Sequence, residues 1–133
     1  TRSDMVQAVL EGVAFAIRDS FEVAKTLGIH IERSKVCGGG AKSPLWRKIF
    51  ANVLNLPLDI PQTEEGPGYG GAMLAMVGCG LYGSVKDCAD ALVTVRETVQ
   101  PDPEIAARYE KQYQRFRSIY PTLKPLFAKL QEQ

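Results

Sequence analysis

Three consecutive glycines followed by a helix-start signal constrain this chain more than any other feature of its sequence. A predicted strand that ends in Val36-Cys37 leads into Gly38-Gly39-Gly40, and Ser43-Pro44 follows after two further residues. Serine at a helix cap with proline at the first helical position is a strong helix-start signal. Glycine lets a ligand lie directly against the backbone, and the free N–H groups of a first helical turn favour an anion. The pattern predicts a strand, an anion-binding turn and a helix; a tight turn without a ligand is the alternative.

Two familiar phosphate-binding motifs share part of this pattern. The P-loop motif G-x-x-x-x-G-K-[ST] fails at both of its glycines. The dinucleotide fingerprint G-x-G-x-x-G is matched by Gly38 and Gly40, with Asp59 about 20 positions further on, but Ser43 replaces the third glycine. A module that binds a dinucleotide or an S-adenosyl compound through Gly38, Gly40 and Asp59 therefore stays open as an alternative. A non-catalytic helical interaction domain, in which the glycines only form a turn, is a further one.

Hydrophobic periodicity predicts a helix-rich α/β fold without internal repeats. Apolar residues recur at every fourth position from Met5 to Phe21, which predicts a helix over residues 4–27 with Gly28 at its C-terminal end. The other predicted elements are a strand at 31–37, a helix at 44–54, a short strand at 56–60, a helix at 71–78 after the glycine-rich segment 66–71, a short helix at 84–91, an irregular or extended segment at 93–99, and a helical tail at 103–131 that Pro121 interrupts.

Composition argues against several classes of function. Sixteen basic and 15 acidic residues give a net charge of +1, so nothing favours a nucleic acid or an anionic membrane as partner. No apolar run reaches the roughly 18 residues that a membrane helix needs. The cysteines Cys37, Cys79 and Cys88 lack the spacing of a disulfide framework or a zinc site, and His30 alone cannot anchor a metal cluster. We expect a cytoplasmic protein that holds no metal in these residues.

Several segments resemble the FGGY family of carbohydrate kinases, in matching order over essentially the whole chain. Residues 4–11 (DMVQAVLE) follow the end of the family's second signature, and residues 37–47 (CGGGAKSPLWR) resemble its adenosine-binding motif. Residues 66–75 (GPGYGGAMLA) resemble the helix that comes next. Residues 101–104, 109–113 and the Tyr120-Pro121 pair are similar to the xylulose-kinase branch of the family.

The resemblance implies an actin-like ATPase (ribonuclease H-like) fold, with two or three short strands in this C-terminal part of the nucleotide-binding lobe. It also implies transfer of the ATP γ-phosphate to a sugar hydroxyl with Mg²⁺, most like the conversion of D-xylulose to xylulose 5-phosphate. By motif position, the nucleotide would lie near Gly38, Gly39, Gly40, Ala41 and Ser43. Gly39 and Gly40 would pass beneath its ribose and α-phosphate, and Ser43 stands where the family often contacts adenine through a longer Asn.

The resemblance implies that the catalytic Asp, the sugar pocket, the Mg²⁺ ligands and the phosphate loops belong to other motifs, none of which occurs in these residues. We therefore expect residues 1–133 to be a C-terminal fragment that is inactive alone and at best a weak half-site for ATP or ADP. No residue here is predicted to be catalytic. Glu11 and Asp19 are expected to form structural hydrogen bonds or ion pairs. A face stripped of its neighbouring strands would be bare, which predicts a homo-oligomer or an adhesive surface.

Overall fold

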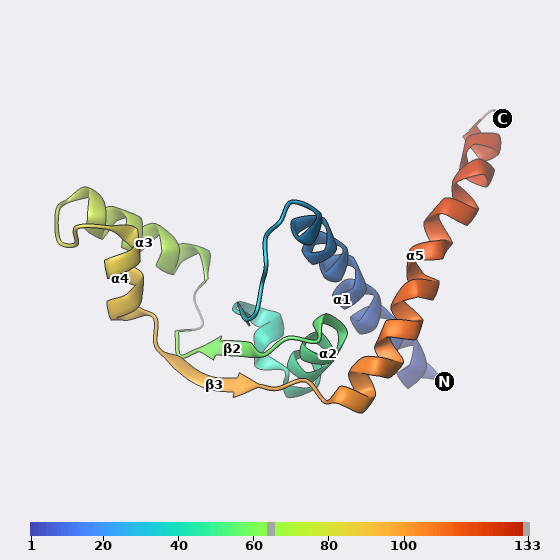
Figure 1. Ribbon diagram of the computed structural model, residues 1–133, viewed down its shortest axis with the longest axis horizontal. Helices are drawn as coiled ribbons and strands as arrows, with labels where there is room; N and C mark the ends of the chain where they lie inside the picture. The colour runs from blue at the N-terminus through green and yellow to red at the C-terminus, as the bar shows by residue number, and fades with distance from the viewer. Residues whose placement is uncertain (64–65, 132–133) are drawn as a thin grey trace.

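The computed structural model describes residues 1–63 and 66–131 (Figure 1). Helices α1, α2 and α5 pack together at one end, and the pair α3–α4 stands at the other, with the strands between them (Figure 1). The elements in chain order are α1 (Arg2–Thr26), β1 (Ser34–Lys35), the 3-10 turn η1 (Gly39–Lys42), α2 (Pro44–Leu54), β2 (Leu58–Pro61), α3 (Pro67–Gly78), α4 (Val85–Leu92), β3 (Val95–Val99) and α5 (Pro103–Gln131).

The sheet is small and mixed, with strand order β1-β2-β3. Strands β1 and β2 run parallel with Ser34 opposite Leu58, whereas β2 and β3 run antiparallel with Leu58 opposite Val99. The strand predicted at 31–37 is only two residues long. The N–H groups of Ser34 and Val36 donate to the carbonyls of Pro57 (3.2 Å) and Asp59 (3.0 Å), and the chain then turns away into the glycine segment although β2 continues to Pro61. The predicted irregular or extended segment 93–99 contains β3.

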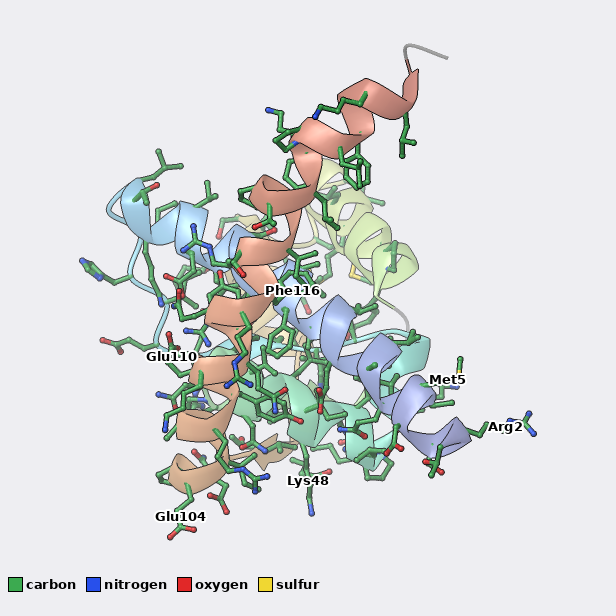
Figure 2. The ribbon with its side chains drawn as sticks, turned by 90° about the vertical axis from the view of Figure 1, so that its right-hand side faces the viewer. Arg2, Met5, Lys48, Glu104, Glu110 and Phe116 are labelled. Atoms are coloured by element: carbon green, nitrogen blue, oxygen red, sulfur yellow. The ribbon has the colours of Figure 1, made fainter. Side chains whose placement is uncertain are left out.

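The core lies where α1 and α5 cross above α2. The Phe15 ring of α1 is 5% exposed and lies within 6.0 Å, centroid to centroid, of Tyr109 and Tyr113 and within 5.4 Å of Phe116. Figure 2 shows Phe116 where α5 passes α1, and it shows Met5 near the far end of α1, away from this crossing. Burying a side chain such as Phe15 contributes about 2–3 kcal/mol, so this aromatic cluster is the main contact between the first and the last helix.

Capping residues explain where the first helices begin and end. Helix α1 starts two residues earlier than predicted because Thr1 and Asp4 form a capping box. It ends at Thr26, and Gly28 then adopts a positive φ of 79°. Helix α2 starts at Pro44 as predicted, with the Ser43 hydroxyl accepting a hydrogen bond from the N–H of Trp46 at 3.3 Å.

The predicted interruption at Pro121 is wrong, because α5 continues through both Pro121 and Pro125. A proline inside a helix removes one N–H donor and crowds the carbonyl four residues earlier, but its fixed φ is helical. The Thr122 hydroxyl donates a hydrogen bond to the Ser118 carbonyl at 2.7 Å, whereas the carbonyl that loses its N–H donor to Pro121 is that of Arg117. The last part of α5 projects away from the other helices (Figure 1), so that no neighbour opposes a local adjustment around the two rings.

Helices α3 and α4 pack on each other more than on the rest of the chain. Helix α3 begins at Pro67, four residues before the predicted start, because Pro67 supplies the favoured first helical residue. The hydroxyl of Tyr69 donates to the Leu92 carbonyl at 2.9 Å and joins the two helices. None of the residues of α3 is buried, although most are apolar or glycine. Within residues 1–63 and 66–131, no helix combines the length and the apolarity required to cross a bilayer.

Candidate functional site

The glycine turn connects the carboxyl end of β1 to the start of α2. Gly38 has φ 85° and ψ −175°, a conformation that favours glycine over any residue with a side chain. One 3-10 turn follows, in which the N–H of Ala41 bonds to the Gly38 carbonyl at 3.1 Å and the N–H of Ser43 bonds to the Gly40 carbonyl at 3.2 Å. The N–H groups of Gly39 and Gly40 open this turn and therefore have no acceptor within it.

The three glycines lack a side chain for three different reasons. Gly38 adopts a positive φ. A Cβ on Gly40 would lie 2.4 Å from the six-membered ring of Trp46, so packing inside the protein excludes a larger residue there. Among residues 1–63 and 66–131, nothing lies within 4 Å of a Cβ placed on Gly39, and its φ is not positive. Neither backbone strain nor internal packing therefore requires glycine at position 39, and its open face is the part of the turn that a ligand can approach.

The other two predicted site residues are placed differently from each other. Ala41 is 8% exposed and its N–H is already bonded, so it can offer little to a ligand besides backbone shape. Ser43 is half-buried, and its hydroxyl oxygen accepts from Trp46 while its own proton stays available for donation. Trp46 is the residue that sequence reasoning missed. The chain has a single Trp, three residues after the cap, and that was the available signal.

The two glycine-rich segments meet beside this turn. A Cβ on Gly66 would lie 2.8 Å from the sulfur of Cys37, so the second segment can approach the first only because residue 66 is glycine. A cavity of about 150 Å³ lies at this junction, lined by residues of β1, the end of β2 and the loop after it, α3 and the two residues before β3, among them Lys35, Tyr69 and Met73. Small-molecule sites usually enclose roughly 300–1,000 Å³. This cavity has the size and the apolar lining of one part of such a site.

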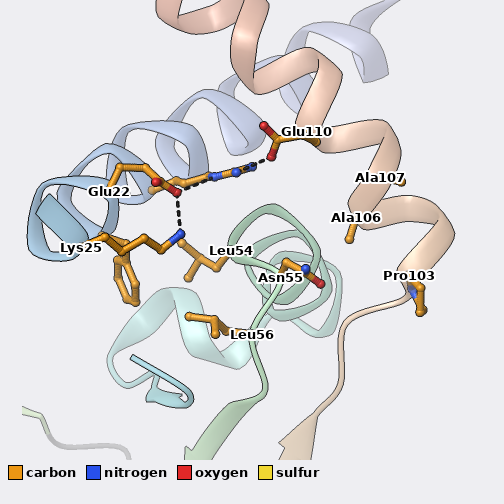
Figure 3. Close-up of a pocket in the computed structure, with 11 residues that line it drawn as sticks. Glu22, Lys25, Leu54, Asn55, Leu56, Pro103, Ala106, Ala107 and Glu110 are labelled. Atoms are coloured by element: carbon orange, nitrogen blue, oxygen red, sulfur yellow. Dashed lines mark hydrogen bonds and ion pairs between the residues drawn. The ribbon is translucent and has the colours of Figure 1, made fainter. Parts of the chain in front are cut away.

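A larger cavity of about 440 Å³ lies elsewhere, between α1, the end of α2 and the start of α5 (Figure 3). Its charged groups bind one another. Glu22 accepts from Lys25 at 2.8 Å and from Arg18 at 3.5 Å, and Arg18 also pairs with Glu110. The hydrogen bond from Lys25 lowers the pKa of Glu22. These ionised groups neutralise one another, so the cavity presents no surplus charge to an anionic ligand.

The acidic residues that the sequence singled out all have structural partners. Asp59 is 2% exposed and accepts from the Thr98 hydroxyl at 2.6 Å and from Arg33 at 3.3 Å. A dinucleotide site needs at least three parallel strands and Asp59 free for a ribose. The sheet has one parallel pair, and the Asp59 carboxylate is already bonded, so that alternative is wrong.

Glu11 and Asp19 are confirmed as structural residues. Glu11 accepts from the Tyr109 hydroxyl at 2.9 Å, and Asp19 accepts from the Tyr113 hydroxyl at 2.5 Å. Burial raises the pKa of both tyrosines, and the neighbouring carboxylates raise it further. In the part of the chain that the structure describes, no group of three or more His, Cys, Asp or Glu side chains lies together as a metal site would need.

Known proteins match the chain along most of its length. The C-terminal domain of the FGGY family of carbohydrate kinases matches residues 1–79. A xylulose kinase of Staphylococcus epidermidis is 33% identical over 130 residues, which are 98% of this chain and 26% of that protein. A solved structure of a xyloylose kinase from Brucella ovis has a TM-score of 0.83 at 34% identity, covering 95% of this chain and 26% of the other. A xylulose kinase structure from Rhodospirillum rubrum has a TM-score of 0.81 at 34% identity, covering 96% and 26%. The chain spans about a quarter of the length of these proteins.

Proposed function

The chain belongs to the FGGY family of carbohydrate kinases, and from this premise we propose that it supplies the adenosine side of an ATP site in a sugar kinase. It is most like the xylulose kinases, and its helix-rich structure with a mixed sheet has the actin-like ATPase fold of its structural neighbours. The observation that carries the proposal is the open face of Gly39 at the start of the 3-10 turn before α2, where the N–H groups of Gly39 and Gly40 have no acceptor within the turn.

Each residue of the turn would contribute in a different way. The N–H groups of Gly39 and Gly40 would donate to phosphate or ribose oxygens, because they have no acceptor within the turn. Gly38 would set the direction of the turn through its positive φ. The Ser43 hydroxyl would donate its free proton to the adenine, since its oxygen already accepts from the protein. Ala41 would only hold the turn in shape from the inside.

Phosphoryl transfer in kinases depends on positioning and on stabilising the charge of the transferred group. ATP supplies that group, with Mg²⁺ neutralising its charge, and we propose D-xylulose as the sugar that receives it. The part played by this chain is to orient the nucleotide. Among the described residues, the carboxylates of Glu11, Asp19 and Asp59 are bonded to their own structural partners, which does not favour any of the three as a general base. Residues 1–133 alone are therefore expected to bind a nucleotide weakly and to phosphorylate nothing.

Two measurements on residues 1–133 test the proposal. Calorimetric titration with ADP should detect weak binding that Gly39→Ala reduces by about five- to thirtyfold, the equivalent of roughly 1–2 kcal/mol. Gly12→Ala is the matched control, because a Cβ at Gly12 also meets nothing within 4 Å but lies on α1, far along the chain from the turn. Equal affinity of both variants for ADP would remove Gly39 from the site. Formation of xylulose 5-phosphate by the chain alone would show that a catalytic base lies within it.

The formation of a homo-oligomer also stays a prediction. Its support is the apolar surface that the structure leaves exposed, including Met5 (73% exposed) and Val9 (66%) on α1 and Leu74 (61%) on α3. Single apolar residues at a surface are ordinary, whereas a helix that is apolar on all sides is normally covered. Sedimentation equilibrium over a range of concentrations decides this point, and a monomer at all concentrations contradicts the prediction.

A further inference from the structure

The indole of Trp46 contacts the glycine turn from the side of α2. Its backbone N–H donates to the Ser43 hydroxyl at 3.3 Å, and its ring occupies the space that a side chain on Gly40 would fill, with two ring carbons 2.4 and 2.6 Å from the position of a Cβ. The same ring packs against Phe50, one helical turn further on, at a centroid distance of 5.4 Å and an angle of 31°. Trp46 therefore contacts the turn at two points and connects it to the buried face of α2.

Packing holds the Trp46 ring in place, without a hydrogen bond from its indole nitrogen to any described residue. The indole nitrogen of Trp46 is buried and has no hydrogen-bond partner among the described residues. A buried tryptophan usually finds an acceptor for this N–H. An indole placed for its own hydrogen bonding would be oriented toward an acceptor. This ring is instead set by its contacts with Gly40 and Phe50.

We propose that Trp46 is the positioning residue of the nucleotide site, which fixes the glycine turn so that Gly39 presents its open face to the ligand. The inference rests on the proposed function. Three adjacent glycines have wide conformational freedom, and among the described residues nothing lies within 4 Å of the position of a Cβ on Gly39. The indole restricts this freedom from the opposite side, at Gly40. Without it the turn is in the binding-competent conformation for only a fraction of the time, and the apparent affinity falls by that fraction.

The first test needs no nucleotide. Amide resonances of Gly38, Gly39 and Gly40 are compared between wild type, Trp46→Leu and Trp46→Phe. We expect Trp46→Leu to broaden or shift these resonances and to speed their hydrogen exchange, and Trp46→Phe to restore most of the wild-type pattern because a ring still covers Gly40. Lys48→Ala is the matched control, since Lys48 is exposed on the same helix and extends away from the turn (Figure 2). Unchanged glycine resonances in Trp46→Leu would overturn the inference.

The second test asks whether the Trp46 ring or the bound nucleotide excludes a side chain at Gly40. If the indole is what excludes a side chain at Gly40, Gly40→Ala weakens ADP binding in wild type but has no further effect in Trp46→Leu, where the space is free. Trp46→Leu by itself is expected to weaken ADP binding about tenfold, which corresponds to a turn that is competent about a tenth of the time. Equal losses from Gly40→Ala in both backgrounds would show that the nucleotide itself needs the space, and the inference fails. No ADP binding by wild type would refute the proposed function instead, while the resonances still decide whether Trp46 holds the turn.

Discussion

Replacing Asp59 tests whether this buried carboxylate holds the sheet together. Asp59 lies in the central strand β2, and the Thr98 hydroxyl of β3 donates to it at 2.6 Å. A hydrogen bond to a charged group stabilises a protein by about 1.5–3 kcal/mol. The ion pair with Arg33 adds about 1 kcal/mol at most, because that side chain is 61% exposed and water screens it. Asp59→Ala should therefore lower the free energy of unfolding by about 2–4 kcal/mol.

Thermal and urea unfolding followed by circular dichroism measure this loss. For a chain of this size 1 kcal/mol corresponds to about 4 °C in Tm, so Asp59→Ala should melt roughly 8–16 °C below wild type. Asp59→Asn keeps an oxygen acceptor for Thr98 and loses only the charge, so we expect a loss of about 1 kcal/mol. Asp90→Ala is the exposed control and should stay within about 0.5 kcal/mol of wild type. If Asp59→Ala is as stable as this control, the carboxylate does not hold β2 to β3.

Three further changes test other parts of the structure. Burial, aided by the hydrogen bond to Glu11, raises the pKa of Tyr109 from about 10 to about 12. The neutral form is favoured on folding, so urea unfolding should show full stability below pH 10 and a loss as the pH rises toward 12. Tyr109→Phe should reduce this pH dependence, and an unchanged dependence of stability on pH would show that Tyr109 is not its cause. Tyr113→Phe removes a hydrogen bond to a carboxylate and should cost about 1.5–3 kcal/mol in the same assay; no loss would mean that water replaces it fully. Pro121→Ala supplies the missing N–H donor to the Arg117 carbonyl and should slow hydrogen exchange in the last turns of α5; exchange as fast as in wild type would show that the proline is not what weakens them.

Local rules predicted the neighbourhood of the glycine turn well. Ser43 and Pro44 start α2 because a cap hydroxyl and a fixed φ act within one turn of the chain. The structural roles of Glu11 and Asp19 also followed from their place on a helix face. The family and the helix-rich fold with few strands were predicted from motifs in matching order, and the comparisons bear them out.

Such local rules could not predict contacts between residues that are distant in the sequence. The two-residue length of β1 depends on where the chain turns away from β2 into the glycine segment, since β2 itself extends two residues beyond the pair. The persistence of α5 through Pro121 depends on the absence of a neighbour that would resist a local adjustment. The reason for a glycine at position 40 lies six residues away in the Trp46 ring, and a sequence pattern alone assigned that glycine to a ligand. The same pattern could not show that Gly38 adopts a positive φ, that the Trp46 ring excludes a side chain at Gly40, and that neither constraint applies to Gly39.

The contacts between α1 and α5 have a consequence for how the chain folds during synthesis. The pairs Arg18–Glu110, Glu11–Tyr109 and Asp19–Tyr113 join residues 92 to 98 positions apart. Ribosomes add about 5–20 residues per second, so the α5-facing side of α1 waits roughly 5–20 s for its partner. During that interval Phe15 lacks its aromatic partners of α5, although α2 can already pack against α1. The first helix is therefore the segment on which a ribosome-bound chaperone would be expected to act.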